Sequence, residues 1–273
     1  MPSDLLATTG IAPSRRRGRP PGTTRSAEEP HVEAVERALA ILEAFDSAHA
    51  ELTLSDLSAR TGFYPSTVLR LSASLGRFGY LRRGVDGRFR LGAAPLRLGA
   101  VYRGAFSLTE HVRPALATLV AETGETAVFY VREGERRICL YRHHPLRAVH
   151  HHVEEGAALP LELGAGGRVL LAFSSRPDTP SGAEVRRRGY AVSLGERDAD
   201  AAAVAAPVFG APSFSPGIAG QPPPGALVGA IGVAGVASRL RETDLPALGR
   251  HVRAAAATLS AELGGSWPVF SDD

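Results

Sequence analysis

The sequence has 273 residues, enough for two domains or one large one, and its 44 % hydrophobic residues favour a packed core. No window contains the roughly 18 uninterrupted apolar residues of a membrane span, and we expect neither a membrane partner nor a signal peptide. Cys139 is the single cysteine, which excludes an internal disulfide and predicts a cytoplasmic location. All 31 basic residues are arginine and the net charge is only +3, so the position of the charge matters more than its sum.

Residues 1–30 are poor in large apolar side chains and are expected to form a basic arm without fixed structure when free. Within this arm, Arg17-Gly18-Arg19-Pro20 is similar to the core of an AT-hook, which lies in the narrow minor groove of A·T-rich DNA. The motif is short, and an ordinary basic arm explains it equally well. Both interpretations predict that Arg17 and Arg19 contact DNA.

Three helices are predicted next. Apolar residues at helical spacing predict an amphipathic helix after Val32. Its expected apolar face consists of Val35, Leu39, Leu42 and Phe45. Thr53 is the expected N-cap of a short second helix, in a capping box with Asp56, and this helix ends at Gly62. A third helix begins near Pro65, because proline is favoured at the first helical position.

A hairpin follows over residues 80–91, because two short segments that read as strands, 80–83 and 88–91, flank the turn signal Asp86-Gly87. The second and third helices with the turn at Gly62 form a helix-turn-helix signature, in which the second helix of the motif enters the major groove of DNA. The arginine-rich hairpin would be a wing on the DNA backbone, with salt-sensitive contacts. A small helical lobe with a solvated hairpin is the alternative.

Hydroxyl groups at the start of the third helix suit phosphate oxygens, and Arg70 could bond a guanine edge in bidentate fashion. In this folded part, the candidate DNA-binding residues are Thr53, Tyr64, Ser66, Thr67, Arg70, Arg82, Arg88 and Arg90.

Helices and strands mix in the rest of the chain. We expect helices over 93–123, strands at 127–131, 138–141 and 148–153, a glycine-rich loop entering a helix at 161–173, β-rich runs at 203–209 and 227–236 around a flexible loop, and a last helix over 244–263. Antiparallel hairpins dominate the start of this part, which favours an α+β domain over a doubly wound one.

The glycine-rich segment Gly164-Ala165-Gly166-Gly167 precedes a predicted helix. Bare N–H groups at the positive end of a helix are a suitable site for a carboxylate. From the residues alone, a tight turn without a ligand explains the segment equally well.

Several motifs resemble those of IclR-type bacterial transcriptional regulators. The stretch from Leu52 to Gly92 is similar to their winged-helix domain, through Leu-Thr-Leu-Ser-Asp-Leu-Ser-Ala-Arg-Thr-Gly, Ser-Thr-Val-Leu-Arg-Leu, Gly-Tyr-Leu-Arg-Arg and Gly-Arg-Phe-Arg-Leu-Gly. Further on, Glu-Thr-Gly-Glu-Thr, Leu-Gly-Ala-Gly-Gly-Arg, Arg-Gly-Tyr-Ala and Ala-Ala-Pro-Val follow in the order of that family, so the resemblance covers roughly residues 32–265.

The resemblance implies an α+β fold, in which a winged helix-turn-helix is joined by a helix to a GAF-like effector domain with a mainly antiparallel sheet. It also implies homodimers or tetramers, a palindromic operator in double-stranded DNA and a small organic acid as effector. The expected division is a basic arm (1–30), the winged helix-turn-helix (31–92), a linker helix (93–107), the effector-binding domain (108–265) and a tail (266–273).

We therefore expect a sequence-specific transcriptional regulator, such as a repressor, whose operator binding is modulated by a small acid. No catalytic residue, cofactor or metal is predicted. The alternatives are an architectural or ligand-independent DNA-binding protein and, less favoured, an enzyme acting on a small acid.

The resemblance also implies the effector-binding residues. They are Gly164, Ala165, Gly166, Gly167, Ser193, Ala203, Gly232 and Ala234. At the last four positions family members often have an acid, a cysteine and serines, so most polar groups that would hold a compact acid are replaced here. We expect a bulkier or more apolar effector, or weak control by a ligand. The segment between Phe173 and Val185 is shorter than is usual in the family, which would expose one side of the pocket or alter tetramer contacts.

Five histidines invite a metal interpretation: His143, His144, His150, His151 and His152. In a strand His150 and His152 share one face and His151 points away, and no cysteine is adjacent, so exposed strand histidines are favoured. Cys139 lies in an apolar run and is expected to be a buried thiol rather than a nucleophile.

Overall fold

The computed structural model describes residues 31–46, 48–105, 108–174, 179–211 and 226–271. The predicted arm, with Arg17 and Arg19, lies outside the described residues, as does the loop predicted at 213–225.

The N-terminal part is a small helical unit with a three-stranded antiparallel sheet of order β1-β3-β2. Its elements are α1 (Glu33–Glu43), β1 (Glu51–Leu52), α2 (Leu54–Thr61), α3 (Pro65–Arg77), β2 (Leu81–Arg83) and β3 (Phe89–Leu91). The capping box of Thr53 and Asp56 begins α2, and Gly62 ends it in the left-handed region at φ 72°, which glycine adopts without strain. Ile41, Leu57 and Val68 are fully buried between the three helices.

The predicted apolar face of α1 is confirmed for Leu42 and Phe45, which pack against the core, and is wrong for Val35 and Leu39. Val35 and Leu39 are 55 % and 53 % exposed, whereas Ile41 is buried. The helix has apolar residues on two sides, and the core takes the side that contains Ile41 and Ala44. Val35 and Leu39 therefore form an outer apolar stripe.

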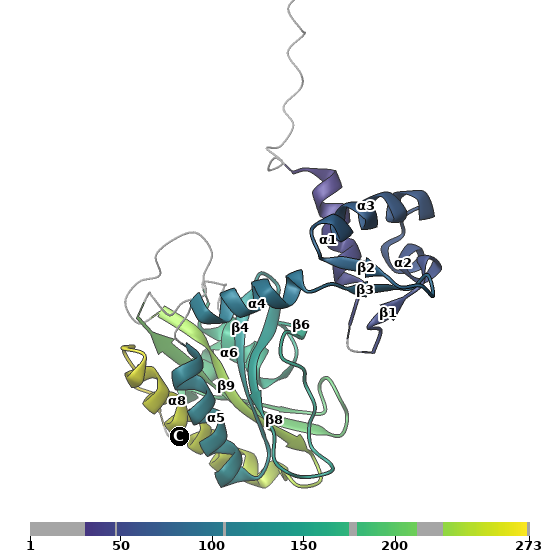
Figure 1. The fold of residues 1–273 in the computed structure, drawn as a ribbon. Helices are drawn as coiled ribbons and strands as arrows, with labels where there is room; N and C mark the ends of the chain where they lie inside the picture. The colour runs from purple at the N-terminus through teal and green to yellow at the C-terminus, as the bar shows by residue number, and fades with distance from the viewer. Residues whose placement is uncertain (1–30, 47, 106–107, 175–178, 212–225, 272–273) are drawn as a thin grey trace, which may run out of the picture.

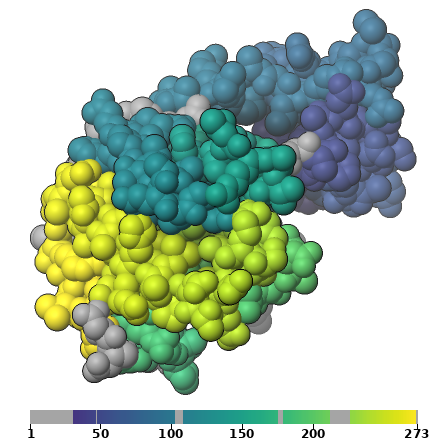
Figure 2. All heavy atoms as spheres, turned by 90° about the horizontal axis from the view of Figure 1, so that it is seen from below, coloured from purple at the N-terminus to yellow at the C-terminus, as the bar shows by residue number. Residues whose placement is uncertain are grey.

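The long helix α4 (Ala94–Ala105) leads from the small unit to the larger one, and α5 (Leu108–Thr123) follows. Figure 1 shows the small unit set apart from the larger one, with α4 between them, and Figure 2 shows it projecting to one side. No helix in the described ranges combines the length and the apolar character of a membrane span.

The larger unit is built on a six-stranded antiparallel sheet of order β6-β5-β4-β9-β8-β7. Its strands are β4 (Thr126–Glu133), β5 (Arg136–His143), β6 (Ala158–Pro160), β7 (Ala191–Leu194), β8 (Ala201–Gly210) and β9 (Ala226–Val236). Its further helices are α6 (Gly164–Ala172), α7 (Pro180–Arg188), the 3₁₀ helix η2 (Glu242–Asp244) and α8 (Leu245–Glu262). The predicted α+β class, with a mainly antiparallel sheet, is confirmed.

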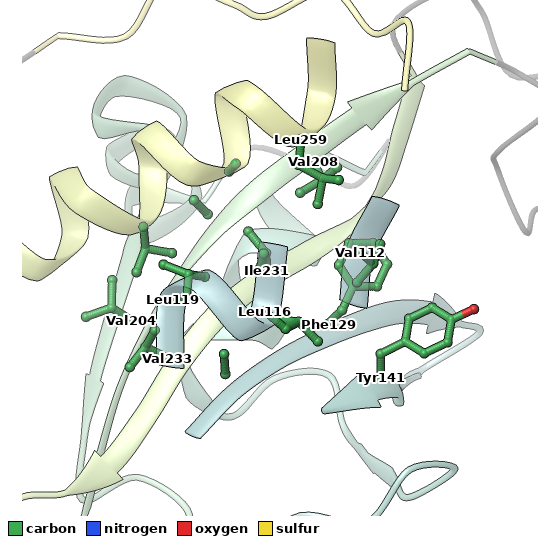
Figure 3. Packing of buried hydrophobic residues seen from close by; sticks show 14 of the residues in the cluster. Val112, Leu116, Leu119, Phe129, Tyr141, Val204, Val208, Ile231, Val233 and Leu259 are labelled. Atoms are coloured by element: carbon green, nitrogen blue, oxygen red, sulfur yellow. The ribbon is translucent and has the colours of Figure 1, made fainter. Parts of the chain in front are cut away.

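Helices cover both faces of this sheet, which explains the near-continuous apolar runs of its central strands. Phe129 and Ile231 pack with α5 and α8 on one face (Figure 3), whereas Val128 and Ala230 pack with α6 and α7 on the other. Alternate residues of one strand therefore serve two cores. The face toward α6 is the one that contains the predicted effector-binding residues.

The strand predicted at 148–153 is wrong, because that segment has no regular structure. Its carbonyl groups accept hydrogen bonds from side chains rather than from a neighbouring strand: Thr126 Oγ1 donates to His151, Arg142 to Val153 and Arg239 to Val149. The strand that pairs with β5 is β6, further along the chain.

Residues 266–271, predicted as a tail, pack back onto the larger unit. The Trp267 ring lies edge-on to the rings of Phe209 and Phe270, at centroid distances of 5.7 and 5.2 Å. The N–H of Ser271 donates to the carbonyl of Arg187, which attaches this segment to α7.

Candidate functional site: a DNA-facing helix and wing, and an acid pocket

The first turn of α3 presents the predicted groove-facing residues. Tyr64, the N-cap of α3, is 82 % exposed, and Ser66 and Arg70 are exposed one helical turn apart. Thr67 is half-buried. No side chain caps the N-terminus of α3. Pro65 has no N–H, and the N–H groups of Thr67 and Val68 donate to the carbonyl of Tyr64, so the Ser66 N–H is the one in this turn that an anion such as a DNA phosphate can take.

Thr53, also predicted to contact DNA, uses its hydroxyl within the chain. Thr53 Oγ1 accepts from the backbone N–H of Asp56 and donates to its carboxylate, at 3.2 and 2.7 Å. The backbone N–H of Thr53 also donates to this carboxylate, at 2.9 Å, and the hydrogen bonds from the Thr53 N–H and hydroxyl lower the pKa of Asp56. Thr53 therefore positions α2, and its hydroxyl is not free for DNA.

The arginines of the wing differ in whether they form ion pairs within the chain. The guanidinium of Arg90 donates to the carboxylates of Glu51 and Asp86, at 2.7 and 2.8 Å, and these pairs raise its pKa. Arg90 is thus neutralised within the wing. Arg82 and Arg88 are exposed, and neither forms an ion pair with the described residues, so both guanidinium groups can face phosphate.

The structure brings together seven of the eight predicted effector-binding residues. All but Gly167 line one cavity of about 50 Å³, between the first turn of α6 and the strands β7, β8 and β9. Gly167 lies behind this lining, where a Cβ would collide with the carbonyl of Leu161, so glycine is required there by packing.

Ionisable residues that were not predicted to bind an effector line the same cavity: Arg137, His151, Glu196, Arg197 and Asp198. They come from β5, from the irregular segment after it and from the turn between β7 and β8. The one sequence signal was the position of Arg137 two residues before Cys139 in a strand, which places both on one face. The others could not be found locally, because only the tertiary fold brings them to the cavity.

Arg137 is only 4 % exposed, which is rare for an arginine. Its guanidinium lies over the ring of Tyr130, 5.1 Å from the centroid, and donates through Nη1 to the carbonyls of Pro160 and Leu163. Burial lowers its pKa, but a guanidinium keeps its charge. Its Nε is buried and has no hydrogen-bond partner among the described residues.

His151 is neutral at pH 7, because burial, reinforced by the positive charge of Arg197, lowers its pKa to about 4. Its Nε2 lies 3.0 Å from Nη2 of Arg197 and accepts from it, since a guanidinium can only donate. The prediction of exposed strand histidines is wrong for His151, which is half-buried at the cavity in a segment that is not a strand.

The N-terminus of α6 already holds a carboxylate of the chain itself. Glu196 Oε2 accepts from the N–H of Gly164 at 2.9 Å, and Glu196 forms an ion pair with Arg168. The expectation that the N–H groups here are bare is therefore wrong for Gly164.

The other two candidates are the histidines near His150 and the thiol of Cys139. His144 stacks on His150 at 5.1 Å, and no group of three possible metal ligands occurs within the residues that the model places. Cys139 is fully buried, and burial raises its pKa to about 12, which makes its thiol a poor nucleophile.

Two family models match the chain. Residues 34–84 match the IclR helix-turn-helix domain, and residues 102–181 and 183–261 match the bacterial transcriptional regulator IclR C-terminal domain. Among characterised relatives, the glycerol operon regulatory protein of Streptomyces griseus is 30 % identical and covers 86 % of this chain and 97 % of its own. The transcriptional regulator KipR of Bacillus subtilis is 26 % identical, over 78 % of this chain and 90 % of its own.

Solved structures agree with these relatives. An IclR-type regulator from Silicibacter sp. TM1040 superimposes with a TM-score of 0.69 at 28 % identity, over 86 % of this chain and 98 % of its own. An IclR homologue from Microbacterium hydrocarbonoxydans, crystallised with 4-hydroxybenzoate, has the same fold, with a TM-score of 0.61 at 22 % identity over 84 % of this chain and 100 % of its own. The chain belongs to the IclR family of bacterial transcriptional regulators, which are not enzymes.

Proposed function

We propose that the chain binds a palindromic operator as a homodimer or tetramer in the cytoplasm, and that a small organic acid in the cavity at α6 changes its affinity for that operator. The single observation that carries the proposal is Arg137, a buried cation with an unpaired N–H beside the first turn of a helix. A carboxylate suits both the Arg137 guanidinium and the helix N-terminus, because it accepts hydrogen bonds from their N–H groups and neutralises the positive charge.

The cavity supports a small acid rather than the bulkier or more apolar effector expected from the sequence. One water requires roughly 10–15 Å³ on this measure, so about 50 Å³ holds only a few heavy atoms. The polar residues replaced on the late strands are compensated by Arg137, His151 and Arg197. Binding of 4-hydroxybenzoate by the homologue from Microbacterium supports the chemical class, although a benzoate would require this cavity to widen.

On the DNA side, we propose that Tyr64, Ser66, Thr67 and Arg70 face the major groove and that Arg82 and Arg88 contact the backbone. Their exposure and charge support this assignment. Thr53 and Arg90 act through the shape of α2 and the wing, because both are engaged within the chain. The arm with Arg17 and Arg19 would add contacts in the minor groove. We propose domain boundaries at residues 30, 92 and 107, with residues 266–271 packed on the effector-binding domain.

The test is a footprint of the full chain on its own promoter, with and without small carboxylic acids. We expect a protected palindrome whose protection changes with an acid, and Arg137→Met should abolish the response to the acid while leaving the footprint in place. A footprint that no acid changes would favour a ligand-independent DNA-binding protein. Unprotected DNA would contradict the proposal altogether.

A further inference from the structure

The turn between β7 and β8 places a carboxylate where the effector's carboxylate is expected. Glu196 lies in this turn, and its side chain is 20 % exposed. It lines the cavity, accepts from the N–H of Gly164 and pairs with Arg168. An acid that entered the cavity would therefore meet an anion already bound at the helix end.

The surroundings of Glu196 contain further groups that can bind an anion. Ala165 and Gly166 follow in the first turn of α6, where N–H groups have no carbonyl partner within the helix, and both line the cavity. The unpaired Nε of Arg137 is buried beside them. At Gly166 and Gly164 a Cβ would press on Tyr130 and on the Arg137 guanidinium, so the absence of side chains lets this cation approach the helix end.

Two carboxylates cannot share this place without strong repulsion, since like charges a few ångströms apart disfavour each other in a poorly solvated site. We propose, on the basis of the pocket function proposed above, that Glu196 is an internal competitor of the effector. The acid's carboxylate takes the N-terminus of α6 and the guanidinium of Arg137, and the Glu196 carboxylate leaves.

The release has a structural consequence, because Glu196 is tied to its neighbours. Arg168, its ion-pair partner, also donates to the carbonyl of Val192 in β7, and the next residue of the turn, Arg197, donates to His151. Displacement of Glu196 therefore frees the β7–β8 turn from α6. The competitor also sets the affinity: the acid binds only the fraction of molecules in which the site is open, so its apparent affinity is lowered by that fraction.

The test compares Glu196→Gln with Asp200→Asn in the full-length protein. Each removes one negative charge from the β7–β8 turn, but only Glu196 lines the cavity and touches the N-terminus of α6, whereas Asp200 is exposed. Binding of acetate, butyrate and benzoate is measured by calorimetry without DNA, each acid against its neutral amide. The glutamine amide oxygen can still accept from Gly164, so the fold should persist, and circular dichroism checks this.

We expect Glu196→Gln to bind at least one of the acids about tenfold more tightly than the unaltered chain, and Asp200→Asn to change affinity less than about twofold. Adding Arg137→Met to Glu196→Gln should remove the gain, and the amides should not show it. Equal or weaker binding by Glu196→Gln would overturn the proposal. So would an equal gain from Asp200→Asn, or no binding of any acid to either protein at millimolar concentration.

This outcome is separate from that of the proposed function. A gain in acid affinity without any change in operator binding would leave Glu196 as a competitor but reject control of DNA binding by the acid. A change in operator binding without a gain in acid affinity would support control of DNA binding by the acid but reject Glu196 as a competitor.

Discussion

Burial changes the chemistry of two side chains that look reactive in the sequence. Cys139 and His151 both lie on the α6 side of the sheet, but one packs in a core and the other borders the cavity. Burial disfavours the charged form of each, which raises the pKa of the thiol and lowers that of the imidazole. Neither is therefore charged at neutral pH.

For Cys139, we expect alkylation by iodoacetamide at neutral pH to be far slower in the folded protein than in denaturant. The thiolate is the reactive form, and a pKa of about 12 leaves almost none of it. Mass spectrometry of labelled protein measures the rate. Rapid single labelling of the folded chain would contradict the burial of the thiol, and Cys139→Ala provides the unlabelled control.

The lowered pKa of His151 makes the stability of the folded chain depend on pH. Its pKa is about 4 in the folded chain and 6.5 in the unfolded chain, so between these values the unfolded chain binds more protons. The free energy of unfolding should therefore fall as pH drops from about 6.5 towards 4, and this contribution should be constant above that range. Urea unfolding near pH 7 and near pH 5 measures the loss.

His151→Gln is the matched variant, because an amide can still accept from Arg197 without titrating. It should lose less stability than the unaltered chain between the two pH values. If both proteins lose the same amount, His151 is not responsible.

At the scale of elements, the arginines of the wing fall into two kinds, those with an ion-pair partner in the chain and those without one among the described residues. Arg88 has no ion pair with described residues, whereas Arg90 ties the turn at Asp86 to β1 through Glu51. We predict that Arg88→Ala makes the plot of log affinity against log salt shallower by about 0.9 for each phosphate that the side chain no longer neutralises. Arg90→Ala should instead lower the unfolding midpoint, because it leaves two carboxylates unpaired.

Fluorescence anisotropy with labelled operator at several salt concentrations measures the slope. Arg250→Ala is the charge-matched control, on the exposed side of α8 in the larger unit, and should leave the slope unchanged. An equal effect of Arg250→Ala would mean that overall charge, rather than the wing, determines the salt dependence.

Local sequence signals predicted most elements but not those that depend on distant side chains. The capping box at Thr53 and the Asp86-Gly87 turn specify α2 and the wing by short-range chemistry, and both elements form where expected. Residues 148–153 looked like a strand, yet distant side chains take their carbonyl groups. The same holds for the residues that line the cavity. Its glycines could be predicted through the resemblance, whereas Glu196 could not, because it lies 32 positions from Gly164 in the sequence.

At the scale of the whole molecule, two apolar stripes remain exposed outside the larger core. On α1, Val35 and Leu39 face outward, and on α4 Leu98 and Val101, three residues apart on one face, are 47 % and 65 % exposed. Apolar faces of this kind mark contacts between chains. A palindromic operator needs two recognition helices held at a fixed spacing, which an interface on the helix joining the two units could provide.

We therefore predict that Leu98→Glu with Val101→Glu converts the protein to monomers, because the stripe can no longer be buried in a second copy. Light scattering after gel filtration measures the mass, and operator affinity should fall because only one half-site is then bound per molecule. Leu146→Glu alters a fully exposed leucine in a loop of the larger unit. It is the control and should change neither the mass nor the operator affinity. A double variant that keeps the mass and operator affinity of the unaltered chain would place the dimer contact elsewhere. Reduced affinity without a change in mass would show that α4 transmits contacts within one chain rather than joining two.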